Sequence, residues 1–511
     1  MRIFSKYSRI NKNRHDAIPD NPEQSISHSP VQPSLTKNIA ILESLFSDTS
    51  DLTVRFLEIK NLSRQAALVY LEGLSDKDMI NNHILRPLIQ ISDEASAEIP
   101  VSIGQVRKEN NWGRLEEAIL EGRSVLLIDQ REEAYILGTQ GWPQRAVSTP
   151  HVEHSIKGAQ QALVETSIQN IALIRRYIQN RELKNKIVQV GTRSKTKISI
   201  LYLEDLANPD LLETLLGRIQ KINVDGILNS GELAEWIEDN PHSPFPQFLI
   251  TERPDIAAAH ILQSRFVIVV DGSPNVIIAP ASFTMFFSSM DDYGSNWVVE
   301  SFIRLQRYFG FFIALLLPAF YIAVISFNYE IIPLKLLLSV GESRGRVPFP
   351  SLIEALIMEF AIEMMREAGI RLPSPIGQTI GVVGGIIIGQ AAVQAGIVSN
   401  IMVIIVALTA IASFILPSYE MASGIRLVRF PMMLLASQFG VFGIMIGLLI
   451  LIAHFISLES LGTPFGSPVA PIHFADLKDS FIRFPMWKIM KIPTNTRALQ
   501  SDRRKHKDDT K

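Results

Sequence analysis

Four long apolar runs in the second half of the chain constrain its fold more than any other feature. Each run is about 20 residues long or longer and carries almost no charge, and about 20 helical residues suffice to cross the roughly 30 Å hydrocarbon core of a bilayer. A soluble protein seldom buries four such segments, so we predict an all-α transmembrane domain over residues 300–457. The runs cover residues 308–327, 376–395, 397–416 and 431–456.

The segment before these runs has the pattern of a soluble α/β region. Between about residues 38 and 287, short aliphatic and β-branched runs alternate with helical patterns, as is typical of alternating strands and helices. No apolar segment follows the basic N-terminus as it would in a signal peptide, so we expect this region to be cytoplasmic. The predicted strands are residues 67–71, 125–128, 198–203, 267–270 and 275–278, and the predicted helices are residues 166–180 and 211–221.

Two stretches of the α/β region recur in the same order, which predicts a duplication. Leu68-Val-Tyr-Leu-Glu-Gly-Leu74 matches Ile200-Leu-Tyr-Leu-Glu-Asp-Leu206. Further on, Leu120-Glu-Gly-Arg-Ser-Val-Leu-Leu-Ile-Asp129 matches Leu262-Gln-Ser-Arg-Phe-Val-Ile-Val-Val-Asp271. Coincidence between two generic strand, turn and helix units is the alternative, but Tyr, Glu, Arg and Asp recur as well as aliphatic residues. We predict related subdomains over residues 38–140 and 155–287, preceded by a polar, disordered tail over residues 1–37.

The sequence offers little that would support catalysis. It contains no cysteine, which excludes thiolate metal sites and cysteine nucleophiles. Gly191-Thr-Arg-Ser-Lys-Thr196 is similar to the end of a phosphate loop, but it lacks required glycines, and a strand rather than a helix is predicted to follow it. We therefore expect a protein that is not an enzyme and that holds neither a cofactor nor a metal.

An acidic helix is predicted between residues 349 and 369, among the apolar runs. Glu359, Glu363 and Glu367 are spaced by four residues and so share one helix face. Carboxylates that face lipid are very costly. The helix is therefore either an interfacial amphipathic helix with a solvated acidic face, or the lining of a water-filled pore in which carboxylates from several copies favour cations.

The run over residues 376–395 combines a glycine stripe with polar amides. Gly381, Gly385 and Gly389 recur every four residues and form a predicted helix-packing seam, because small residues let helix backbones approach closely. The other side is half apolar and half amide, and amides inside a bilayer need partners. Either an interhelical hydrogen bond or a pore wall would provide these partners. The candidate pore-lining residues are Thr379, Val383, Ile386, Ile387, Gln390 and Gln394.

The charge near the C-terminal end predicts the orientation of the protein in the membrane. Residues 478–511 contain ten Lys and Arg against four Asp and Glu, and short basic segments favour the cytoplasm. We predict a basic cytoplasmic tail over residues 472–511. The N- and C-terminal regions then share one side of the membrane, which requires an even number of crossings.

Several long motifs of the chain are distinctive. They include Gly141-Trp-Pro-Gln-Arg145, Asp239-Asn-Pro-His-Ser-Pro-Phe-Pro-Gln247, Thr251-Glu-Arg-Pro-Asp255, Pro348-Phe-Pro350 and Arg366-Glu-Ala-Gly-Ile-Arg-Leu-Pro373. In these motifs, which follow one another in order over about residues 38–487, the chain resembles the GerA/SpoVAF spore germination family, and within it the A subunits of spore germinant receptors.

The resemblance implies a role in waking dormant bacterial spores in response to nutrients, in the inner membrane of the spore. It implies a permease-like B subunit and a lipoprotein C subunit as partners, and oligomerisation into an ion-conducting channel in the lipid bilayer. The residues themselves leave two main alternatives open. One is a channel subunit, and the other is a non-conducting scaffold or signal-relay subunit that binds partners through residues such as Trp142 and Phe245. Nucleic acid is not an expected partner.

Overall fold

The computed structural model describes residues 29–60, 62–90, 99–141, 150, 153, 158–372, 385, 387–489 and 491–502. By its internal contacts the chain divides into two compact units. Most of the predicted tail lies outside the described residues, and the domain boundaries drawn from the sequence remain predictions. The first unit comprises Met1–Val147, Leu163–Ile187 and Ser199–Glu204, and the second comprises Ser148–Ala162, Val188–Ile198 and Asp205–Lys511.

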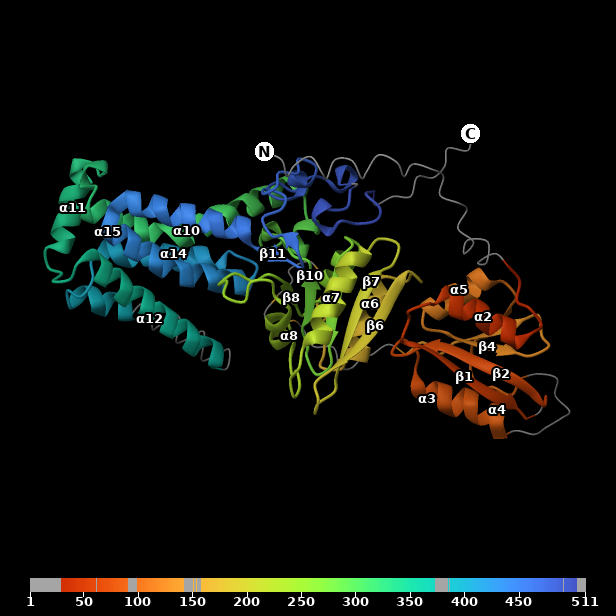
Figure 1. Cartoon of the computed structure of the whole chain (residues 1–511). Coiled ribbons are helices and arrows are strands. Elements are labelled where there is room, and N and C mark those ends of the chain that lie inside the picture. The colour runs from red at the N-terminus through yellow and green to blue at the C-terminus, as the bar shows by residue number, and fades with distance from the viewer. Residues whose placement is uncertain are drawn as a thin grey trace. The chain divides into compact units, whose positions relative to one another are not determined.

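The first unit contains a five-stranded sheet with helices on both faces (Figure 1). Its strand order is β1-β2-β4-β5-β3, and each neighbouring pair is antiparallel. Successive residues of a strand point to opposite faces, so Ala67 and Val69 of β2 pack with α2 and α5, whereas Ala66 and Leu68 pack with η1 and α4. The elements are α2 (Leu35–Leu45), β1 (Leu52–Ile59), β2 (Arg64–Leu71), α3 (Lys77–Met79), η1 (Ile80–Leu85), α4 (Arg86–Gln90), β3 (Val106–Glu109), α5 (Trp112–Leu120), β4 (Ser124–Ile128) and β5 (Ala134–Leu137).

A second five-stranded sheet repeats this topology with the order β6-β7-β9-β10-β8. In both sheets, the neighbours are therefore the first, second, fourth, fifth and third strands of the set. The two stretches that recur in the sequence fall on equivalent elements, since the first includes the ends of β2 and β7 and the second includes β4 and β9. The predicted pair of related α/β subdomains is thus confirmed. The elements are α6 (Ser167–Tyr177), β6 (Leu183–Val190), β7 (Thr196–Leu203), α7 (Pro209–Lys221), α8 (Ser230–Ile237), β8 (Leu249–Thr251), α9 (Pro254–Ile261), β9 (Phe266–Val270) and β10 (Val276–Ala279).

The segment that is similar to a phosphate loop forms a hairpin. Residues 191–195 join β6 to β7, which are neighbours in the second sheet. A connection of this length can join only antiparallel neighbours. The helix that a phosphate loop requires after it is therefore replaced by a strand.

The helical part of the chain begins at Trp297. α10 (Trp297–Ser326) and α15 (Tyr419–Ser457) are long and apolar enough to cross a membrane, whereas α14 (Asn400–Phe414) has only 15 residues and spans about 22 Å. The run over residues 397–416 thus gives a shorter helix than a full crossing needs. Half of the run over residues 376–395 lies outside the described residues. Other helices after β10 include η2 (Phe283–Phe287), η3 (Met290–Tyr293), η4 (Tyr329–Ile331), α11 (Leu334–Arg344), α12 (Ser351–Arg371), η5 (Asp476–Asp479), η6 (Met486–Lys488) and η7 (Thr494–Thr496).

The helix α15 is not one straight rod. Gly440 has φ 60° and ψ −141°, which are not helical values. A Cβ atom placed on Gly447 would lie 2.2 Å from Sδ of Met432, although the stretch of straight helix between these two residues would span about 22 Å. α15 is therefore a helical hairpin with limbs over residues 419–439 and 441–457. The prediction of a single crossing over residues 431–456 is wrong, because this apolar run contains the apex of the hairpin.

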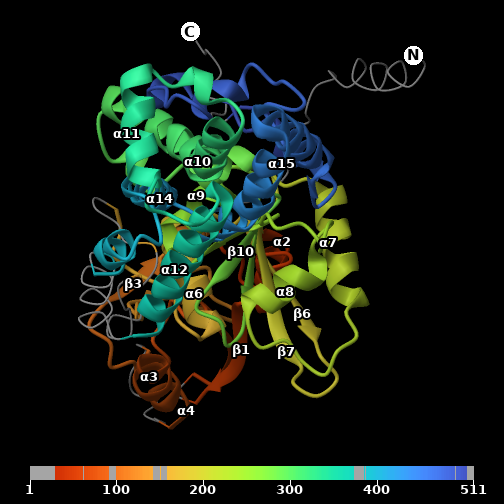
Figure 2. The ribbon, with the colours of Figure 1, turned by 90° about the vertical axis from the view of Figure 1, so that its left-hand side faces the viewer.

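The end of α10, the start of α12 and the apex of α15 meet at one end of the helical bundle. Ser326 and Ser351 share a hydrogen bond of 2.8 Å, and a Cβ atom on Gly440 would lie 3.0 Å from Oδ1 of Asn328. α10 also packs along α14 and α15 (Figure 2). The first limb of α15 thus begins, and the second limb ends, at the other end of the bundle, where α10 begins.

The chain returns from α15 to the second sheet. The backbone N–H of Phe283 donates to the carbonyl of Phe465 at 2.8 Å, and the N–H of Ala281 donates to Oγ of Ser460 at 2.9 Å. These contacts hold the segment after α15 beside the end of β10. The segment contains a two-stranded sheet of β11 (Glu459–Ser460) and β12 (Thr463–Pro464).

Candidate functional site

The proline-rich motif over residues 239–247 touches both limbs of the α15 hairpin. Oγ of Ser243 and Nε2 of His454, on the second limb, share a hydrogen bond of 3.0 Å. On the first limb, a Cβ atom on Gly424 would lie 2.5 Å from the carbonyl oxygen of Pro244, so only a glycine allows this approach. The motif therefore connects the second α/β subdomain to the base of the hairpin.

The side chain of Gln247, the last residue of the motif, makes hydrogen bonds to the backbone near the start of the motif. The side-chain amide of Gln247 accepts from the backbone N–H of Asn240 at 2.9 Å and donates to the carbonyl of Asn240 at 2.7 Å. Gln247 is buried, and prolines fix φ within the loop. The motif thus forms a stiff contact rather than a loose linker.

A buried arginine joins three helices in the middle of the bundle. Pro318 of α10 has no N–H, so the carbonyl of Ala314 one turn earlier lacks its helical partner. Nε of Arg429 on α15 donates to this carbonyl at 2.6 Å, and Nη1 of Arg429 donates to Oε2 of Glu359 on α12 at 2.5 Å. The side chains of Arg429 and Glu359 are 3% and 5% exposed. Removing one partner of such a buried pair typically costs about 3–5 kcal/mol.

Further charges extend this pair into a cluster. Glu363 lies 2.9 Å from Arg366 and 3.3 Å from Arg426. Together with Arg429 and Glu359, three guanidinium groups face two carboxylates, which leaves one excess positive charge. Four buried polar atoms of the cluster have no hydrogen-bond partner among the described residues, and three of them belong to N–H groups. These atoms are Glu359 Oε1, Arg366 Nε, Arg426 Nε and Arg429 Nη2. The cluster therefore has donors to spare for a water molecule or an anionic oxygen.

Each carboxylate of the predicted acidic face has an arginine partner within the chain. Beyond the two pairs above, Glu367 lies 2.6 Å from Arg371. Exposure rises along the face, from 5% for the side chain of Glu359 to 44% for Glu363 and 60% for Glu367. The sequence pattern identified these carboxylates but not Arg429, which lies far beyond Glu359 in the chain. A pore role for the acidic face stays a prediction.

The predicted pore-lining residues are only partly described. Ile387 is 58% exposed, and Gln390 and Gln394 are exposed as well. These three residues belong to a helical stretch over residues 387–394. The other candidates lie outside the described residues, namely Thr379, Val383 and Ile386.

Two glycines of the predicted seam lie near other helices of the same chain. A Cβ atom on Gly389 would lie 3.6 Å from Val403 of α14, and one on Gly385 would lie 3.8 Å from Met365 of α12. Gly381 lies outside the described residues. The described part of the seam therefore has neighbours within one chain, and its role in packing stays a prediction.

Comparisons with known proteins identify the family to which this chain belongs. A family model described as Bacillus/Clostridium GerA spore germination protein matches residues 40–495. The chain is 40% identical to the uncharacterized membrane protein YfkQ of Bacillus subtilis (strain 168), over 91% of each chain. It is 39% identical to spore germination protein KA of Bacillus subtilis (strain 168), over 91% of this chain and 87% of that protein.

Two further matches are a third relative and a solved structure. The chain is 40% identical to spore germination protein GerLA of Bacillus cereus, over 85% of this chain and 90% of that protein. Among solved structures, the N-terminal domain of the A subunit of the Bacillus megaterium spore germinant receptor GerK3 is 28% identical, with a TM-score of 0.39, over 50% of this chain and 98% of that chain. The family match covers both α/β subdomains and the helical bundle, and the chain belongs to the GerA family of spore germination proteins.

Proposed function

We propose that this chain is the A subunit of a spore germinant receptor in the inner membrane of the bacterial spore. Its membership of the GerA family supports a role in germination, and the names of its relatives support the same role. In this proposal the chain works with a permease-like B subunit and a lipoprotein C subunit, and its N- and C-terminal regions are cytoplasmic.

We further propose that several copies assemble into a nutrient-gated, ion-conducting channel. The observation that carries this step is the exposure of Gln390 and Gln394 on a helical stretch of the apolar run. An amide at membrane depth needs a hydrogen-bonding partner, and a second copy or a water-filled path provides one. Ile387, on the same stretch, would act as a hydrophobic constriction.

The bundle gives such a pore wall a rigid support. Arg429 links three helices through Glu359 and the free carbonyl of Ala314. Because these charges are buried and paired, we assign them to holding the bundle rather than to contact with ions.

A scaffold without conductance is the second candidate, and the packing of Phe245 does not favour it. That scaffold was expected to bind partners through Phe245, whose side chain is 2% exposed. Its ring centroid lies 4.5 Å from that of Phe455 on α15. Phe245 therefore packs inside the chain, and Trp142 lies outside the described residues.

The channel is tested by reconstituting the purified full-length protein into liposomes and measuring cation flux and oligomer size. We expect Ile387→Ala to raise cation leakage, because a smaller side chain widens a hydrophobic constriction, and Gln390→Lys to lower cation flux by placing a positive charge in the path.

Leu449→Ala is the matched control, because Leu449 is an exposed apolar residue of α15 outside the predicted pore wall. Flux that is the same in both test variants and in the control would refute the pore assignment. A role in germination would survive that result.

A further inference from the structure

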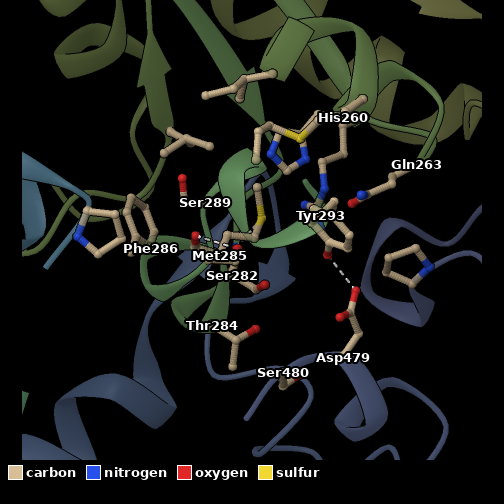
Figure 3. A pocket seen from close by; sticks show the side chains of 18 of the residues that line it. His260, Gln263, Ser282, Thr284, Met285, Phe286, Ser289, Tyr293, Asp479 and Ser480 are labelled. Carbon is tan, nitrogen blue, oxygen red and sulfur yellow. Dashed lines mark hydrogen bonds between the residues drawn. The ribbon is translucent and has the colours of Figure 1, made fainter. Parts of the chain in front are cut away.

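A cavity of about 1050 Å³ lies within the second unit, between the second sheet and the segment after α15. Residues of β8, α9 and η3 line it together with residues of η5 and η6. Figure 3 shows His260, Gln263 and Tyr293 close together, and a dashed line joins Tyr293 to Asp479 of the segment after α15. The volume is at the upper end of the range for small-molecule sites.

Arg265 lines this cavity, and no carboxylate of the described residues lies within ion-pair distance of it. Its side chain is 2% exposed, Nη1 donates to the carbonyl of Pro280, and Nη2 donates to Oδ1 of Asn495 at 3.4 Å. Nε has no partner among the described residues. The charge of Asp476 acts on Arg265 from beyond ion-pair distance. Burial lowers the pKa of Arg265 to about 9, so the guanidinium is still charged at neutral pH.

The first subdomain has a carboxylate at the position that matches the residue beside Arg265. Arg123 occupies the equivalent place in the matching stretch of that subdomain, and it pairs with Glu121 at 3.0 Å. The counterpart of Glu121 in the second subdomain is Gln263. An amide carries no charge, so the repeat that holds the cavity lacks the carboxylate that neutralises its arginine.

Two more buried polar atoms at the cavity lack partners among the described residues. They are Nδ1 of His260 and Nδ2 of Asn495. Burial, together with the charge of Arg265, lowers the pKa of His260 to about 3, so the ring is neutral and Nδ1 carries a proton in one of its two tautomers. The amide of Asn495 is a donor in any state.

Other charges of the lining are divided between the two signs. Lys478, Lys488 and Lys491 add positive charge, and Glu252 and Glu420 add negative charge. Glu153 adds a carboxyl group whose pKa is raised by burial to about 7. The two carboxylates of η5 are already engaged. Asp479 accepts from Tyr293 at 2.7 Å and pairs with Arg304, and Asp476 accepts from the backbone N–H of Thr494 at 2.8 Å.

We propose that this cavity binds a small anion, bearing a carboxylate or a phosphate group, on the guanidinium of Arg265. Asn495 and the donor tautomer of His260 complete the binding site. A buried guanidinium with a free N–H is stabilised by an oxyanion more than by any neutral ligand. This site is independent of the channel, since it lies outside the apolar runs.

The test is saturable thermal stabilisation of the purified full-length protein in neutral detergent at constant ionic strength. The probes are acetate, inorganic phosphate and dihexanoyl phosphatidylglycerol below its micellar concentration, with acetamide as the neutral control. We expect at least one anion to raise the melting temperature with a saturable dependence, and acetamide to have no effect. The effective probe distinguishes a free carboxylate, a free phosphate and a lipid headgroup.

Gln263→Glu places in the second subdomain the carboxylate that the first one has, and we expect it to lower the anion affinity at least tenfold. Gln263→Met keeps the volume without the charge and retains the affinity. Glu121→Gln, made in the other repeat, leaves binding unchanged. The proposal is overturned if no anion gives a saturable shift, or if Gln263→Glu binds as tightly as Gln263→Met.

Discussion

The turns before β4 and β9 have the same backbone conformation, but only the first has a carboxylate beside its arginine. In the first, the N–H groups of Gly122 and Arg123 donate to carbonyls three and five residues earlier. Ser264 and Arg265 make the same two bonds in the second, and the middle residue has positive φ in both, 85° at Gly122 and 65° at Ser264. The repeated fold fixes where the arginine lies, and one neighbouring residue decides whether its charge is neutralised.

In the helical bundle, as in the first turn, an arginine is paired with a carboxylate. Arg429 is buried like Arg265, yet it has Glu359 as a partner. The first unit does the same with Arg175, which pairs with Asp51 at 2.5 Å. Most buried arginines among the described residues are neutralised in this way, and Arg265 and Arg483 are the two that have no carboxylate within ion-pair distance. Of these two, Arg265 lines the cavity beside α9, so the cavity is the place where a ligand would supply the missing charge.

The largest effect is expected from Arg429→Met, which breaks a neutralised pair. It leaves the carboxylate of Glu359 buried and the carbonyl of Ala314 without a donor, so we expect a loss of about 3–5 kcal/mol in the free energy of unfolding. Arg371→Met is the control, because its pair with Glu367 is exposed and such pairs contribute little. Chemical unfolding in detergent measures both. Equal effects would show that burial does not set the cost.

A smaller effect is expected from exchanging the middle residues of the two turns. A Cβ atom on Gly122 would lie 2.9 Å from the carbonyl oxygen of Leu74, so Gly122→Ser adds a close contact to the strain of positive φ and should cost about 2–3 kcal/mol. Ser264→Gly relieves that strain but removes the bond from Oγ of Ser264 to Leu206, so its net effect should stay within about 1 kcal/mol.

Urea unfolding of the full-length variants compares these two values. If Gly122→Ser were no worse than Ser264→Gly, the positive φ and the close approach of Leu74 at Gly122 would not carry the expected cost.

The smallest effect concerns Glu153, which lines the same cavity as Arg265. Burial raises the pKa of Glu153 to about 7, against about 4.5 for the exposed group. Between these values the folded protein keeps a proton that the unfolded chain has lost, so this residue makes stability fall as pH rises from about 4.5 to 7. Glu153→Gln should flatten that part of the pH profile of the melting temperature. An unchanged profile would mean that Glu153 is solvated.

Much of the α/β region could be predicted from the sequence. The seven predicted strands and helices of this region all exist, because runs such as residues 267–270 are apolar, β-branched and bounded by turns. Strands such as β3 were missed, since its residues are mostly exposed and charged, and an edge strand of that kind has no apolar alternation to detect.

The helical part was predicted less well, because its decisive contacts are distant in sequence. Gly440 marks the apex of a hairpin, but in the sequence it looks the same as Gly443 and Gly447 of the same run. Its special role depends on its contact with Asn328. Three helices, α11, α12 and α14, separate these two residues along the chain. Arg429 likewise acts on Ala314 only because Pro318 leaves that carbonyl free. The periodicity of apolar residues predicts which side chains share a helix face, but it does not predict which helix faces contact each other.

The contact of the motif over residues 239–247 with α15 has a mechanical consequence. One short loop holds the entrance and the exit of the hairpin, through Gly424 and His454. We therefore expect any displacement of that loop to tilt both limbs of the hairpin together. A small movement at the edge of the second sheet would in this way reach the far end of the bundle, where the apex of the hairpin meets the end of α10.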